Sequence, residues 1–266
     1  MRRIESRFPS VAAPEAKRVV LTVDSRSREN KENTTASDYV VRFPNLGQII
    51  YARLLSAEIP NCQYVINSKN NVIDLKDGSG SYVVTITPGT YTALSLADEV
   101  NLQLNAALGL APDVNFTVTY ITATQKMRIT RVLGGTFDLL FKTGPTASRS
   151  IGRNLGFLND YVGVTSVSSE RIVDLAGENF VLLVIDRFDG LQNTESIRDV
   201  FAKIIWNSPP RFVCYDSFVS NAIYFREPLQ NLDRLRVRFI QQDGTLYDFN
   251  GLDHSFSIEL YVNTTR

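Results

Sequence analysis

The stretch that decides the fold contains two alternating runs, Leu235-Arg-Val-Arg-Phe239 and Phe256-Ser-Ile-Glu-Leu-Tyr-Val262. In each run every second residue is apolar, and the residues between them are arginine, serine, glutamate or tyrosine. A period of two is typical of a β-strand with one buried face and one solvated face. Asp243-Gly244 and Asn250-Gly251 between the runs are strong turn signals. We therefore predict that the chain closes with antiparallel strands, and this stretch shows no set of catalytic residues.

The rest of the chain contains further segments of the same kind. Strands are expected at 18–23, 39–43, 49–59, 72–75, 82–87, 116–121, 126–130, 137–141, 172–175, 179–185, 200–206 and 218–224. Many strands of modest length with long connections favour a β-sandwich or jelly roll over a barrel built only from hairpins.

One segment interrupts the strand pattern. Apolar residues at 96, 100, 104 and 108 keep the four-residue spacing of a helix face, and Ser95 with Asp98 resembles a capping box. A shorter helix is expected over 148–158, ending near Gly156. Residues 80–161 then form an inserted strand–helix–hairpin–helix unit. It is either an elaborate loop that completes one fold or a subdomain that faces a partner.

The remaining boundaries follow from this interruption. Residues 1–16 are expected to form an extended arm, 17–79 and 162–266 the β core, and 162–170 a connector inside it.

Cys62 and Cys214 are expected to be buried thiols in a reducing compartment. The start of the chain lacks the apolar stretch of a signal peptide.

The charge balance argues against direct binding of nucleic acid. Lys+Arg and Asp+Glu both number 28 in 266 residues, so the net charge is zero, whereas proteins that neutralise phosphates usually carry a basic excess. Arg2, Arg3 and Arg7 make only a small basic group in the arm. The longest apolar run, near 180–185, is too short to span a bilayer.

Candidate chemical groups are few, and we expect no catalytic, cofactor-binding or metal-binding residues. His254 is the single histidine, which is too few for a cupin-type metal site. A triad of His254, Asp253 and a serine has no supporting nucleophile motif, and a histidine beside a turn is usually a surface or hydrogen-bonding residue. Asp243, Asp248, Asn250 and Asp253 offer oxygen ligands for calcium, but they lack the spacing of an EF-hand loop and fit turns better. No acid pair is singled out for glycoside hydrolysis.

Two surface features leave alternatives open. Arg234, Arg236 and Arg238 share one strand face, which is either a solvated face with acidic neighbours or a contact with another subunit. A carbohydrate- or receptor-binding module would need exposed aromatic side chains gathered on one face or loop tip. Tyr161, Tyr215 and Tyr247 are scattered in the sequence and do not decide this.

Several segments in order resemble minor capsid and penton-type proteins of large icosahedral nucleocytoplasmic DNA viruses, the group of the chlorella and giant viruses. They are Leu21-Thr-Val-Asp-Ser-Arg-Ser-Arg28, Ser37-Asp-Tyr-Val-Val-Arg-Phe-Pro44, Leu54-Leu-Ser-Ala-Glu-Ile-Pro-Asn61, Ile86-Thr-Pro-Gly-Thr-Tyr91, Asn154-Leu-Gly-Phe157, Phe201-Ala-Lys-Ile204, Phe225-Arg-Glu-Pro-Leu229 and Tyr247-Asp-Phe-Asn-Gly-Leu-Asp-His-Ser-Phe256.

The resemblance implies a mainly β protein with a single jelly roll, an antiparallel β-sandwich, that carries the small α+β insertion. Two tandem jelly rolls would usually need a longer chain. It also implies a structural virion protein without enzymatic activity or cofactors, assembled in the host cytoplasm into the capsid of a double-stranded DNA virus. The implied partners are the major capsid protein, other minor capsid proteins and, at a vertex, four further copies. The internal viral membrane could lie nearby, with no transmembrane segment in this chain.

Overall fold

The protein is mainly β and divides into two compact units. The computed structural model describes residues 16–191, 197–207, 213–214 and 222–263. One unit comprises the chain up to Cys62 and from Asn179 onward, and the other comprises Gln63–Glu178. The inserted unit therefore extends beyond the expected 80–161, because residues 63–79 and 162–178 contribute strands and core residues to it. The expected arm falls outside the described residues except for Ala16, which begins the first strand.

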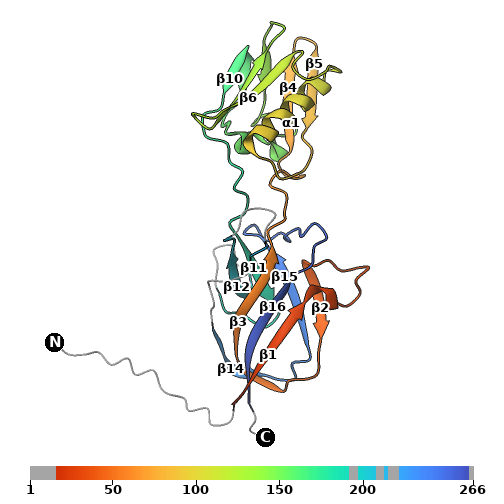
Figure 1. The fold of residues 1–266 in the computed structure, drawn as a ribbon, viewed down its shortest axis with the longest axis vertical. Coiled ribbons are helices and arrows are strands. Elements are labelled where there is room, and N and C mark those ends of the chain that lie inside the picture. The colour runs from red at the N-terminus through yellow and green to blue at the C-terminus, as the bar shows by residue number, and fades with distance from the viewer. Residues whose placement is uncertain (1–15, 192–196, 208–212, 215–221, 264–266) are drawn as a thin grey trace, which may run out of the picture. The chain divides into compact units, whose positions relative to one another are not determined.

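Eight strands of the first unit form two antiparallel sheets (Figure 1). One sheet has the order β1-β16-β3-β14, with the short β13 (Val213–Cys214) also paired to β3. The other sheet has the order β12-β11-β15-β2. The strands are β1 (Ala16–Asp24), β2 (Asp38–Arg42), β3 (Gln48–Pro60), β11 (Phe180–Ile185), β12 (Val200–Ile205), β14 (Ile223–Leu229), β15 (Arg234–Ile240) and β16 (Ser255–Asn263).

The pairing of these eight strands is that of a jelly roll. Taken in chain order, the first strand pairs with the eighth (β1 and β16), the second with the seventh (β2 and β15), the third with the sixth (β3 and β14) and the fourth with the fifth (β11 and β12). A long hairpin rolled into two sheets produces this nesting. The expected single jelly roll is confirmed, and the insertion lies in its β3–β11 connection.

The two alternating runs at the end of the chain occupy different sheets. β15 lies between β11 and β2, whereas β16 lies between β1 and β3. Both strands direct their apolar residues into one core, where Phe239 and Phe256 have ring centroids 6.2 Å apart. The alternation therefore predicted the buried face correctly, while the connection between the strands crosses from one sheet to the other.

The inserted unit has its own hydrophobic core. A four-stranded sheet contains β5 (Gly80–Thr85), β4 (Val72–Asp77), β8 (Phe137–Leu139) and β9 (Tyr161–Val164), in that order. A three-stranded sheet contains β10 (Ser166–Ser168), β7 (Lys126–Arg131) and β6 (Phe116–Ile121). Helix α1 (Ala93–Ala106) packs against β5 and β6, and the short α2 (Gly152–Leu155) ends at Gly156, whose φ is 87°. The short helices η1 and η2 span Ser25–Ser27 and Ala147–Arg149.

The start of α1 differs from its prediction. The N-cap is Thr92, whose hydroxyl accepts from the amide of Ser95, while the Ser95 hydroxyl accepts from the amide of Thr92. Ser95 is thus the third residue of the helix rather than its cap, and Asp98 is exposed. Threonine and serine are both favoured N-cap residues, so residue type alone did not separate the two positions.

Two further predictions within and beside the inserted unit are wrong. The expected connector 162–170 holds most of β9 and all of β10, which pairs with β7. The expected strand 172–175 has no strand pairing, although Val173 and Leu175 pack against the core of the inserted unit.

Of the expected strand 218–224, residues 218–221 lie outside the described part, and β14 begins at Ile223.

A buried asparagine joins α1 to β6. Asn105 is fully buried, and its Nδ2 donates to the carbonyls of Asn101 and Phe116 at 2.8 and 2.9 Å. Its Oδ1 accepts from the backbone amides of Asn115 and Phe116 at 2.9 and 3.0 Å. The amide side chain therefore bonds to the amides of Asn115 and Phe116 and the carbonyl of Phe116 at the edge of β6, and ties them to α1.

Asn105→Leu should destabilise the protein by about 2–4 kcal/mol, because a leucine of similar size leaves these backbone groups buried and unpaired. Urea unfolding measured by circular dichroism gives the change. Gln103→Leu on the same helix is the matched control, since Gln103 is only partly buried and should change stability by less than about 1 kcal/mol. Equal effects of the two substitutions would contradict this role of Asn105.

Candidate functional site

A polar cluster connects the end of β1 to the start of β16. Ser25 is fully buried, and its hydroxyl donates to Asp253 Oδ1 at 2.7 Å and accepts from the amide of His254 at 3.0 Å. Arg28 Nη1 donates to the same Asp253 oxygen at 2.7 Å and to the Ser25 carbonyl at 2.8 Å. The hydroxyl of Ser25, followed by the guanidinium of Arg28, holds the pKa of Asp253 below its usual value. The cluster holds two loops that are far apart in sequence.

His254 is a buried core residue rather than a surface residue. It is 4% exposed, and its ring centroid lies 4.4 Å from that of Phe239 and 4.7 Å from that of Phe249. Nε2 lies 2.8 Å from the carbonyl oxygen of Ala36, so Nε2 carries the proton, because a carbonyl only accepts. Burial lowers the pKa of His254 to about 4. The imidazole is therefore neutral at physiological pH and acts as a hydrogen-bonding core group.

The three residue types of a hydrolytic triad meet here, but they are connected differently. In a triad the histidine ring takes the proton of the serine hydroxyl, and the carboxylate orients the ring. Here the Ser25 hydroxyl donates to Asp253, and only the backbone amide of His254 reaches Ser25. This arrangement fixes the loop and does not activate a nucleophile.

The acids considered for calcium form turns. Asp243 accepts from the amide and hydroxyl of Thr245 at 2.9 and 2.6 Å, and Asp248 accepts from the amide of Asn250 at 2.7 Å. Asn250 has a φ of 48°, a left-handed conformation that asparagine tolerates, and its Nδ2 donates to the carbonyl of Cys62. In the described residues, no group of three or more His, Cys, Asp or Glu side chains is arranged to hold a metal.

The arginine stripe on β15 has acidic neighbours. Arg236 makes two hydrogen bonds to the carboxylate of Asp38 at 3.2 and 3.1 Å, and Arg238 lies 3.3 Å from Asp186. Arg234 is exposed at the end of the strand. The first of the two interpretations, a solvated face with acidic neighbours, therefore accounts for two of the three arginines.

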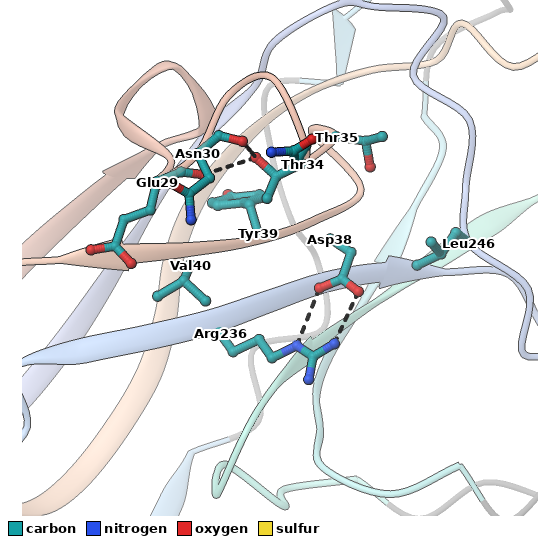
Figure 2. A pocket seen from close by; sticks show the side chains of 10 residues that line it. Glu29, Asn30, Thr34, Thr35, Asp38, Tyr39, Val40, Arg236 and Leu246 are labelled. Atoms are coloured by element: carbon teal, nitrogen blue, oxygen red, sulfur yellow. Dashed lines mark hydrogen bonds and ion pairs between the residues drawn. The ribbon is translucent and has the colours of Figure 1, made fainter.

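A polar hollow of about 480 Å³ lies beside this stripe, between the loop after η1 and strands β2 and β15 (Figure 2). Thr34 donates to the carbonyls of Glu29 and Asn30, and Figure 2 shows Asp38 and Arg236 facing each other. Glu29 is paired with Arg42 outside the hollow. Each of the three charged residues that line it is thus already neutralised, which leaves no free charge to attract an ionic ligand.

A row of tyrosines crosses the outer face of the β1-β16-β3-β14 sheet. Tyr261 lies opposite Tyr51, and Tyr51 lies opposite Tyr224, with ring centroids 5.0 and 5.1 Å apart in edge-to-face contact. Tyr224 is 77% exposed. We call Tyr51, Tyr224 and Tyr261 the tyrosine row.

An ion triad lies beside the tyrosine row. The carboxylate of Glu259 is almost fully buried between the guanidinium groups of Arg18 and Arg53, one on each oxygen. Arg18, with Arg53 beside it, holds the pKa of Glu259 below its usual value. Arg18 lies opposite Tyr261 in the register of β1 with β16, so the ion triad and the tyrosine row occupy neighbouring positions on one sheet face.

No pattern in the sequence predicts the tyrosine row. Its members lie on β3, β14 and β16, and only the pairing register brings them together. Of the tyrosines considered before, Tyr247 is buried, Tyr161 is partly buried in the inserted unit, and Tyr215 lies outside the described residues. The alternation in β16 did place Tyr261 on the solvated face.

The cysteines were expected to be buried. Cys62 is only half-buried; its thiol donates to the carbonyl of Phe249 at 3.1 Å, and burial raises its pKa to about 12. Cys62 is therefore a protonated thiol at neutral pH. The side chain of Cys214 lies outside the described residues.

Among the helices that the structure describes, none is long and apolar enough to cross a membrane.

The buried histidine makes stability depend on pH. The folded state holds His254 neutral down to about pH 4, whereas the unfolded chain takes up a proton near pH 6.5. Because the unfolded state binds more protons between these values, stability falls as the pH is lowered through that window. His254 is the single histidine in the chain.

The free energy of unfolding should be roughly 1 kcal/mol lower at pH 5.5 than at pH 7. Urea titrations at the two pH values measure the difference. His254→Gln keeps an amide donor for Ala36 and should remove most of the pH dependence. A variant that retains the full dependence would show that another group titrates in this window.

Comparison with known proteins finds a matching family and similar solved structures. Residues 13–191 match the family of unknown function DUF5901. A selenomethionine-labelled mavirus penton protein of known structure is 9% identical, with 92% of this chain and 99% of that chain covered and a TM-score of 0.42. No curated protein matches. Because the family match covers more than half of its residues, the chain belongs to the DUF5901 family of unknown function.

Proposed function

We propose that this protein is a structural subunit of a virion, a minor capsid or penton component of an icosahedral capsid. The observation that carries the proposal is the complete jelly roll with a separate folded unit inserted in its β3–β11 connection. Each unit has its own core, so the jelly roll and the insertion each present a stable surface to neighbouring molecules.

The order of short segments that resemble minor capsid and penton-type proteins of nucleocytoplasmic DNA viruses also supports this role. The partners proposed on that basis are the major capsid protein, other minor capsid proteins and, at a five-fold vertex, further copies of the chain. We propose assembly into the capsid of a double-stranded DNA virus in the host cytoplasm. The N-terminal segment and the exposed parts of the insertion are the contact regions proposed from the sequence.

We also propose that the protein works without catalysis or a cofactor. The described residues that first suggest chemistry have structural partners: Ser25, Asp253 and His254 hold the β1 and β16 loops together, and Asp243 and Asp248 form turns. Binding to neighbours would then depend on the area and shape of the surfaces that the sheets support.

Native mass spectrometry of the purified full-length chain, followed by co-sedimentation with assembled major capsid protein, tests this role. A stable pentamer would support a vertex position, and a monomer that binds only assembled capsomers would support a cementing position. A monomer that binds neither free nor assembled major capsid protein would contradict the proposal.

The tyrosine row favours one alternative, a carbohydrate- or receptor-binding module of a virion spike or tail. Exposed aromatic rings gathered on one sheet face are the feature that this alternative requires, and Tyr224 is the most exposed of them. A glycan array discriminates the two functions. Binding that is lost in Tyr224→Ala, together with no affinity for capsid protein, would favour the alternative.

A further inference from the structure

The ion triad leaves a net positive charge beside the tyrosine row. Two guanidinium groups, those of Arg18 and Arg53, share the single carboxylate of Glu259. The Glu259 side chain is 5% exposed, whereas the side chains of Arg18 and Arg53 are 56% and 39% exposed. Solvent therefore meets the two cations while the carboxylate lies covered between them, and an anion at this face is attracted rather than repelled.

Strand register places these cations and the tyrosine row on one continuous surface. Arg18 lies opposite Tyr261, so it is in line with the row, and Arg53 lies opposite Glu259 in the adjoining row of side chains. Val20, 47% exposed, lies opposite Glu259 from the other side. Neighbouring strands lie about 4.8 Å apart, so the surface from β1 to β14 is about 14 Å wide. It combines aromatic rings, an apolar side chain and two exposed cations.

This combination narrows the class of ligand. The exposed rings, above all that of Tyr224 at 77%, favour a ligand with an apolar face, and the net charge favours an anion. Single-stranded nucleic acid carries a phosphate at every nucleotide and needs a groove with many cations. A peptide that binds as an added strand needs a sheet edge, whereas the tyrosine row lies on a sheet face. An acidic sugar has apolar C–H faces, hydroxyl groups and a carboxylate, so it matches each part of this surface.

We propose that the tyrosine row and Arg18 together bind a saccharide that carries a carboxylate group. The sugar ring packs on Tyr224 and its neighbours in the row, and the carboxylate meets the guanidinium of Arg18. Arg18 contacts Glu259 through Nε, so its Nη1 and Nη2 can make a two-pronged contact with a second carboxylate. The site rests on the carbohydrate-binding alternative proposed above, whose ligand class it specifies, and it does not depend on the capsid role.

A glycan array probed with the purified full-length protein tests the ligand class. Sialyllactose and a glucuronate-bearing disaccharide supply the carboxylate from two kinds of sugar, and lactose and cellobiose are their neutral counterparts. At least one acidic glycan should bind, and its neutral counterpart should bind more weakly by about threefold or more. Added salt should weaken the binding of the acidic glycan, because it screens the attraction between exposed charges.

Three point variants locate the site. Arg18→Gln should weaken the binding of the acidic glycan by about three- to fivefold and leave that of its neutral counterpart unchanged. Tyr224→Ala should weaken both, because it removes the exposed ring. Arg234→Gln, which removes the same charge from β15 in the other sheet, is the matched control and should change neither. Circular dichroism checks that each variant is folded.

The outcomes separate this site from the function on which it rests. Equal binding of acidic and neutral glycans would overturn the acidic site and leave a carbohydrate-binding module. Acidic binding that keeps its full strength in Arg18→Gln would overturn the site as well, because the carboxylate would then lie elsewhere. If none of the four glycans binds, both the acidic site and the carbohydrate-binding alternative fail, and the capsid role is unaffected.

Discussion

The pairing of β1 with β16 is the constraint on which the rest of the jelly roll depends. Nine consecutive residues of each strand pair without a register shift, although they come from opposite ends of the chain. β16 also pairs with β3 along its other edge, so it is an interior strand of its sheet. Its inward residues Phe256, Ile258, Leu260 and Val262 all belong to the core. Without β16, β1 would lose its partner and the core would lose one side.

This pairing has consequences for how the two units form. Contacts across more than two hundred residues are slow to form, because loop closure costs entropy before the contact contributes stability. The inserted unit lies between β3 and β11 and has its own core, so its strands pair over shorter distances in sequence. The Ser25–Arg28–Asp253 cluster adds a hydrogen-bonded closure at the end of the β1–β16 pair. We infer that β1 and β3 complete their pairing in this sheet only when β16, the last strand of the chain, joins them.

The local pattern of apolar and polar residues predicted much of the fold. Apolar and polar residues alternate in most strands, and the apolar residues of α1 recur at helical spacing. This pattern did not predict which strands pair. The runs around Phe239 and Phe256 follow one another in the sequence, but they lie in different sheets and pair with strands from elsewhere in the chain. His254 was expected to be a surface or hydrogen-bonding residue; it does bond to the Ala36 carbonyl, but its ring lies among aromatic side chains. The tyrosine row was missed for a related reason, since register alone assembles it.

The local sequence pattern was an equally incomplete guide to function. The serine, acids and histidine that first suggest a site are used to hold loops, while the surfaces open to partners consist of residues with no chemical motif. We propose that this jelly roll serves as a building block of a capsid. Single-particle cryo-electron microscopy of virions that contain the chain tests it most directly. The account predicts density for the jelly roll at symmetry-related positions of the capsid shell. Virions whose shell reconstruction leaves no density for this chain would contradict it.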